Sequence, residues 1–169
     1  MGMYTELILG CTLSKELPKV CIDALDFVIN GVDKQPRYEN PTGWEQKEYN
    51  ERFIERTTPV EETRAFIEEY DLRYILRGSS YYFGAPPVCR LYYDHIDQGY
   101  RISTRANCKN YKLAIERFLK YISPFVISGS GEHEIYACVQ YEEDEFPTVY
   151  SIDGTYHLTG ELSPKQFDV

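Results

Sequence analysis

Tyrosines and arginines interleave in the middle of this 169-residue chain, in a pattern that could bind nucleic acid. Successive side chains of a β-strand point to opposite faces, so Arg101, Ser103 and Arg105 are predicted to share one face of a strand. A row of arginines beside tyrosines suits contact with phosphates and stacking on bases. The residues predicted to form such a nucleic-acid site are Arg77, Tyr81, Tyr82, Arg101, Arg105 and Lys109.

The same residues also have a structural interpretation, in which Arg and Tyr pair across strands on a solvated sheet face. Residues 71–121 carry 9 Lys and Arg against 4 Asp and Glu, whereas residues 1–70 and 122–169 have net charges of −6 and −8. A chain with a total charge of −9 repels a polyanion unless its basic face is well segregated. The acidic total therefore favours the structural interpretation, and nucleic-acid binding stays an alternative.

Four consecutive acidic residues follow a predicted strand near the end of the chain. Carboxylates beside tyrosines could offer a basic partner an acidic surface with aromatic contact area. The residues predicted to bind such a protein partner are Glu142, Glu143, Asp144, Glu145, Tyr141 and Tyr150, with Tyr136 close by. The alternative is an ordinary solvated loop between two strands.

Enzyme chemistry has little support in the residue pattern. His95 with Asp94 and Asp97 could form an acid/base or weak metal site, but such residues are also common in hairpin turns. His133 and His157 are distant in sequence, and no GxSxG nucleophile motif is present. The chain has five scattered cysteines and no zinc-ligand spacing. We therefore predict no catalytic residue, no metal and no cofactor, with a hydrolase that uses His95 or His133 as a third hypothesis.

Alternating and helical periodicities predict the elements that would position these residues. In residues 3–13, Leu7, Leu9, Cys11 and Leu13 are predicted to share one face of a strand. Helices are predicted over residues 18–31, 59–69 and 111–122, the last capped by Asn110. Further strands are predicted over residues 74–83, 88–94, 99–104, 133–141, 148–152 and 155–158. Residues 32–58 read as a charged excursion and residues 160–169 as a frayed tail.

This order of elements predicts a single α+β domain over residues 1–169, a mainly antiparallel sheet with two to three helices packed on one face. The apolar stretches are far shorter than the roughly 20 residues that cross a bilayer. Because no signal-peptide pattern is present either, we expect a cytoplasmic protein with no membrane contact. The oligomeric state is left open.

Several short motifs resemble a family of uncharacterised small proteins from bacterial and phage or mobile-element genomes. The motifs are SSYYF at 79–83, ISTR at 102–105, Asn107, KNY at 109–111, Phe118, Pro124, YEE at 141–143 and Pro147. The resemblance covers the first strand and helix and about residues 74–150. It implies no catalytic residue, but it implies a context in which accessory proteins act as inhibitors or decoys. A non-enzymatic protein that inhibits or sequesters a basic host or defence protein is the first functional expectation.

Overall fold

A computed structural model describes residues 4–31, 59–77, 88–128, 134–152, 154–158 and 162–164 of the chain. The strands are β1 (Thr5–Ser14), β2 (Val88–Asp94), β3 (Gly99–Cys108), β4 (Val126–Ile127), β5 (Ile135–Tyr141), β6 (Thr148–Ser151), β7 (Gly154–Leu158) and β8 (Leu162–Pro164). The α-helices are α1 (Lys19–Asp26), α3 (Glu61–Glu69), α4 (Leu72–Arg77) and α5 (Ala114–Ile122). Shorter helical segments are η1 (Phe27–Gly31), η3 (Tyr111–Leu113) and η4 (Ser123–Phe125).

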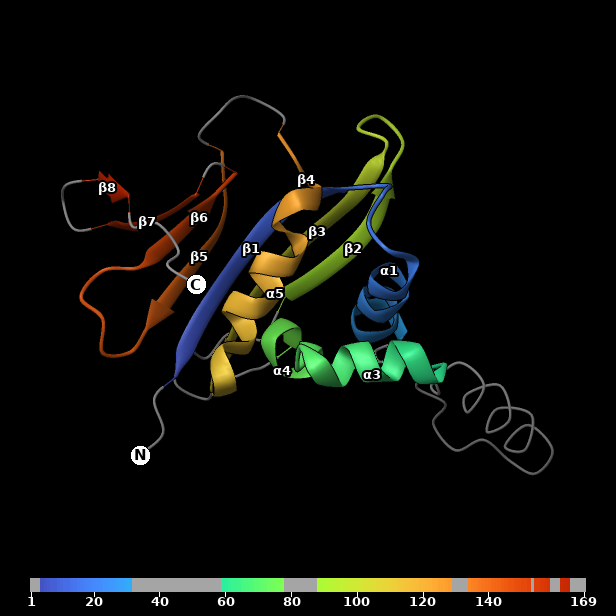
Figure 1. Ribbon diagram of the computed structural model, residues 1–169, viewed down its shortest axis with the longest axis horizontal. Helices are drawn as coiled ribbons and strands as arrows, with labels where there is room; N and C mark the ends of the chain where they lie inside the picture. Colours follow the sequence, from blue (N-terminus) through green and yellow to red (C-terminus); the bar gives the residue numbers. More distant parts are fainter. Residues whose placement is uncertain are drawn as a thin grey trace, which may run out of the picture.

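The strands form one sheet in the order β2-β3-β1-β5-β6-β7-β8, and β4 also pairs with β1. Every pairing between the described strands is antiparallel. Figure 1 shows α5 crossing β1 in front of the sheet, with α1, α3 and α4 beside it. The predicted α+β class, with a mainly antiparallel sheet, is therefore confirmed.

The central strand β1 has one face in the core and the other toward solvent. Leu7, Leu9 and Leu13 are buried, whereas Ile8 between them is exposed. The apolar side of α5 packs into the same core, and its buried residues are Ala114, Ile115, Phe118, Leu119 and Ile122. These patterns agree with the periods that the sequence predicted for each element. The exception is Tyr111, which the helical period also placed on this side but which lies before α5 and is exposed.

Residues 74–77 form part of a helix, although a strand was predicted over residues 74–83. Leu72, Ile75 and Leu76 are buried at i, i+3 and i+4, which is the spacing of one helix face, and they form α4. The Thr104 hydroxyl donates a hydrogen bond of 2.9 Å to the Leu76 carbonyl, which joins α4 to β3. The prediction of a strand from Tyr74 was wrong because a four-residue window of Tyr, Ile, Leu and Arg fits both periods. Residues 78–87 lie outside the described ranges.

The C-terminal segment also differs from its prediction. Residues 162–164 were expected to fray, but they form β8, in which Leu162 pairs with Leu158 of β7. Pro164 stands on the last strand of the sheet order, where a residue that cannot donate a backbone hydrogen bond is tolerated. The predicted excursion at 32–58 lies outside the described residues.

Candidate functional site

The acidic turn, which we define as residues 142–146, connects β5 to β6. The Gln140 side-chain amide donates to the carbonyls of Asp144, at 2.6 Å, and Tyr141, at 3.0 Å. The Asp144 backbone N–H donates to the Tyr141 carbonyl at 3.1 Å. These hydrogen bonds fix the backbone of the turn while the side chains of all four acids lie in solvent.

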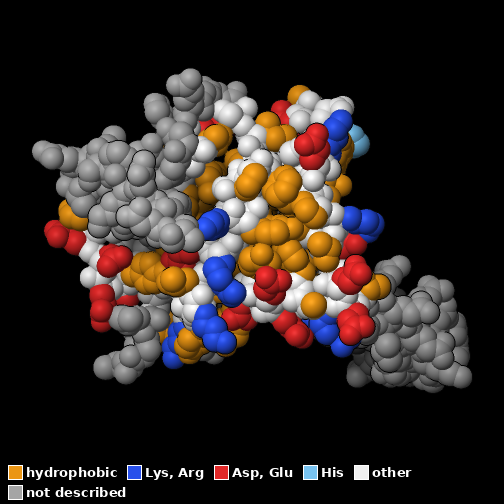
Figure 2. All heavy atoms as spheres, viewed as in Figure 1, with side chains coloured by type: hydrophobic (Ala, Val, Ile, Leu, Met, Phe, Trp, Pro, Cys, Tyr) orange, Lys and Arg blue, Asp and Glu red, His pale blue; other side chains and the backbone are white. Residues whose placement is uncertain are grey.

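Phe146 ends the acidic turn and is 41% exposed. Glu143, Asp144 and Glu145 form no ion pair with another described residue, so their charges stay available to a partner. Figure 2 shows acidic side chains around the β5–β6 connection, with Lys and Arg side chains near the start of α5. The turn therefore combines unpaired negative charge with one accessible aromatic ring.

Tyr4 links the acidic turn to the loop that precedes α5. Its backbone N–H donates to Oε2 of Glu142, and the Glu142 N–H donates to the Tyr4 carbonyl, each at 3.0 Å. The Lys109 Nζ lies 5.8 Å from the centroid of the Tyr4 ring, within the range of a cation–π contact. The acidic turn and the basic loop, defined as residues 109–113, are thus neighbours on one end of the sheet.

A polar network beneath these two segments fixes their positions. The Tyr141 hydroxyl donates to Oε1 of Glu116 on α5. The Asn110 amide donates to Oε2 of Glu116 at 2.7 Å and to the Tyr141 hydroxyl at 2.8 Å. The Asn110 Oδ1 accepts the N–H of Ile115, in the first turn of α5, at 3.0 Å. The prediction that Asn110 is the N-cap residue of this helix was wrong, because α5 begins at Ala114 with Leu113 as its N-cap residue, and Asn110 caps the first turn from farther back in the chain.

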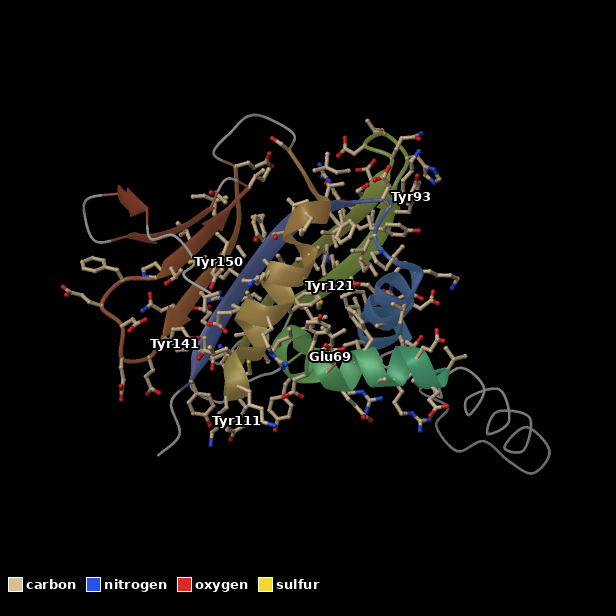
Figure 3. All side chains as sticks on the ribbon, in the orientation of Figure 1. Glu69, Tyr93, Tyr111, Tyr121, Tyr141 and Tyr150 are labelled. Atoms are coloured by element: carbon tan, nitrogen blue, oxygen red, sulfur yellow. The ribbon has the colours of Figure 1, made fainter. Side chains whose placement is uncertain are left out.

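Tyr141 and Tyr150 both lie between strands β5–β6 and helix α5 (Figure 3). Tyr150 is only 4% exposed, and it pairs with Ala137 on the face that the helix covers. Burial and the nearby Glu116 carboxylate raise the pKa of both tyrosines above its ordinary value. The expectation that these tyrosines line the partner surface is corrected, because the register of β6 turns Tyr150 into the core and the Tyr141 hydroxyl is engaged by Glu116.

Of the predicted nucleic-acid residues, the structure describes the side chains of Arg101, Arg105 and Lys109. Arg101 and Arg105 do share the exposed face of β3, as predicted. Arg101 lies 3.6 Å from Asp94 and 3.2 Å from Asp97, and Arg105 lies 2.6 Å from Glu6. Their charges are therefore largely neutralised by carboxylates.

Of the other four residues in that set, only Lys109 has a described side chain. Lys109 belongs to the basic loop beside Tyr4, at the end of β3. Tyr81, Tyr82 and the Arg77 side chain lie outside the described residues.

His95 lies in the β2–β3 hairpin, and it forms no hydrogen bond or ion pair with a described carboxylate. Its ring contacts Tyr93, with centroids 5.1 Å apart. Asp94 instead accepts the backbone N–H groups of Ile96, at 2.8 Å, and Asp97, at 3.4 Å, and these hydrogen bonds lower the pKa of its carboxyl. This is the geometry of a turn-forming aspartate. His133 and the His157 side chain lie outside the described part.

Comparisons of the chain with family models, with curated proteins and with solved structures find no match. The resemblance to small bacterial and phage proteins therefore stays a prediction. Among the described residues, no helix has the length and apolar character needed to cross a membrane. The same ranges contain no cluster of three potential metal ligands.

Tyr4, Glu116 and Phe146 were missed in the predicted site. Glu142 meets Tyr4 across 138 positions of sequence, so no local pattern could indicate this contact. The contact of Glu116 with Asn110 could have been predicted, because the two residues lie on either side of the start of the predicted helix.

Buried ionisable groups give the fold a defined response to alkaline pH. Burial raises the pKa of Cys11 and Cys21 to about 12, that of Cys108 to about 11 and that of Tyr136 to about 12. The unfolded chain releases these protons near the ordinary values of 9.0 and 10.0, whereas the folded chain retains them. We expect the free energy of unfolding to be highest below about pH 9 and to fall as the pH rises toward about 12.

Urea unfolding followed by circular dichroism, in steps from about pH 7 to about pH 11, measures this response. The variant Cys21→Ala should show a shallower decline because it lacks one of the retained protons. A free energy of unfolding that stays constant across this range would contradict the assignment.

Proposed function

We propose that this chain is a non-enzymatic, cytoplasmic binding protein whose acidic turn engages a basic segment of a partner protein. The observation that supports this most is the set of three exposed carboxylates, Glu143, Asp144 and Glu145, none of which is ion-paired to another described residue. They stand on a backbone fixed by Gln140 and next to the exposed Phe146. A turn whose backbone is already fixed presents these charges to a partner with a smaller ordering cost than a loose loop would.

Such a surface combines long-range attraction with a short-range anchor. Unpaired carboxylates accelerate the encounter with a basic partner, most strongly at low salt. The Phe146 ring can then bury apolar area at a small entropic cost. In the bacterial or mobile-element context that the resemblance implies, the protein would sequester or inhibit a basic host or defence protein.

Nucleic-acid binding through the sheet face has weaker support. Arg101 and Arg105 already pair with acidic residues, so a phosphate would have to displace Asp94, Asp97 and Glu6. A chain with a net charge of −9 would also repel the rest of the polyanion. We therefore keep it only as an outcome to be tested.

The test uses a fluorescent peptide of about ten residues with four lysines in a glycine and serine background. The change is the triple variant Glu143→Lys, Asp144→Lys and Glu145→Lys. An exposed ion pair contributes up to about 1 kcal/mol, and reversal turns attraction into repulsion, so affinity should fall by roughly 100-fold at low ionic strength. Fluorescence anisotropy measures the dissociation constant.

The matched control reverses three exposed acids elsewhere, in the variant Glu16→Lys, Glu62→Lys and Glu68→Lys. It changes the net charge by the same amount and should retain most of the affinity. Equal loss in both variants would show that only total charge matters, and no binding at low ionic strength would refute the proposal.

A further inference from the structure

The basic loop has a backbone conformation that side chains ordinarily avoid. Lys112 and Leu113 are consecutive, and both have a φ of 55°. In this left-handed region the Cβ atom approaches the following carbonyl, which costs roughly 1–2 kcal/mol per residue that is not glycine. A chain selected for stability alone would place glycine or asparagine at these positions.

Neighbouring hydrogen bonds hold the basic loop in this conformation. Asn110 is bonded at once to Glu116, to Tyr141 and to the N–H of Ile115. The Tyr111 N–H donates to the Lys109 carbonyl at 3.0 Å, which closes a tight turn before the left-handed residues. Both ends of the loop are therefore attached to the same network that carries the acidic turn.

The result of this strain is an accessible row of three side chains. Tyr111 is 57% exposed and Leu113 is 59% exposed, and Lys112 between them is also exposed. Lys109 and Lys112 form no ion pair with any other described residue. Strained backbone that persists beside exposed apolar and unpaired charged groups is typical of binding segments.

We infer that the basic loop is the second half of the partner-binding surface and that it receives an apolar side chain flanked by a carboxylate. This inference rests on the proposed function, because the acidic turn supplies the other half. Both parts of this bound segment have a counterpart in the basic loop. Lys109 and Lys112 attract its carboxylate, and Tyr111 and Leu113 offer apolar contact to its side chain. Tyr4 joins both halves, so one partner with a basic stretch and an acidic, apolar stretch can contact both.

Three labelled peptides test the inference by fluorescence anisotropy. The first is the lysine peptide described above, the second carries leucine between glutamates, and the third joins the two through a glycine and serine linker. The joined peptide should bind the unchanged protein at least about tenfold more tightly than the lysine peptide, because the second contact becomes intramolecular.

Leu113→Gly is the most informative variant. It removes the apolar side chain, and glycine adopts the left-handed backbone conformation of this position without strain. Loss of the leucine contact should weaken binding of the glutamate–leucine peptide about tenfold, and Lys112→Glu should weaken it about fivefold. Neither change should alter binding of the lysine peptide alone by more than about twofold. The control Ile96→Ser alters an apolar residue that is 91% exposed in the β2–β3 hairpin, and it should leave all three affinities unchanged.

The outcomes separate the two proposals. If the lysine peptide binds and responds to the acidic turn, but the joined peptide gains nothing, the inference fails and the proposed function stands. If the lysine peptide does not bind, the proposed function fails. Binding of a labelled single-stranded oligothymidine that is lost in Lys112→Glu would show that the loop is a nucleic-acid contact, and it would overturn the inference.

Discussion

Replacement of Phe118 by alanine is expected to lower the free energy of unfolding by about 3–5 kcal/mol. Phe118 is fully buried on the inner face of α5, and its ring contacts that of Tyr70 with centroids 6.3 Å apart. Loss of the ring removes apolar burial and leaves a cavity between α5 and its neighbours. Since domains are stable by only about 5–15 kcal/mol, this one change takes a large share of the total.

Urea unfolding followed by circular dichroism measures the change in Phe118→Ala. The matched control is Tyr74→Ala, which removes an aromatic ring that is exposed on α4 and should cost less than about 1 kcal/mol. Because α5 carries Glu116 and receives the Asn110 cap, the lysine peptide should also bind less tightly once the helix loosens. A loss below about 1 kcal/mol would show that α5 does not anchor the core.

Replacement of Asn110 by alanine should cost about 2.5–4 kcal/mol, the second-largest effect that we expect. The change removes the cap on the Ile115 N–H, which contributes about 1 kcal/mol. It also removes one hydrogen bond to the half-buried Glu116 carboxylate, and hydrogen bonds to charged groups contribute about 1.5–3 kcal/mol. Urea unfolding measures the loss, and the glutamate–leucine peptide should bind less tightly because the basic loop loses its support.

Asn110→Asp distinguishes the cap from the network. Aspartate keeps the acceptor for Ile115, but it places a second carboxylate beside Glu116 in place of the amide donor. Two ionised carboxylates repel each other, so the stability deficit of this variant relative to the parent should be small at acidic pH, where they are protonated, and should grow toward neutrality. A deficit that is independent of pH would show that only the cap matters.

The elements that follow a single period were predictable from sequence. Leu7, Leu9 and Leu13 alternate along β1, and Ile115, Phe118 and Ile122 repeat along α5, so their buried faces follow from strand and helix geometry alone. The shared face of Arg101 and Arg105 followed from the same alternation. The predicted acidic residues are exposed at a turn, because four adjacent carboxylates are too costly to bury in an apolar core.

The tertiary structure decided what the local periods left open. Tyr74 to Arg77 became helix instead of strand because burial of Leu72, Ile75 and Leu76 requires one helical face. Tyr150 entered the core because β6 pairs with β5 in a register that sets it beside Ala137. Residue type alone could not indicate either result.

The sequence by itself determined six of the strands, β1 to β3 and β5 to β7, together with the inner face of α5 and the charge of the acidic turn. The fold alone decided that Tyr4 joins that turn to Lys109, and that Asn110 and Glu116 lock both segments to Tyr141. It also decided that Lys112 and Leu113 occupy left-handed backbone. The physical reason is that these hydrogen bonds join residues that are distant in sequence, up to 138 positions apart. Such contacts depend on the register of the strands, and they produce no periodic pattern in the sequence.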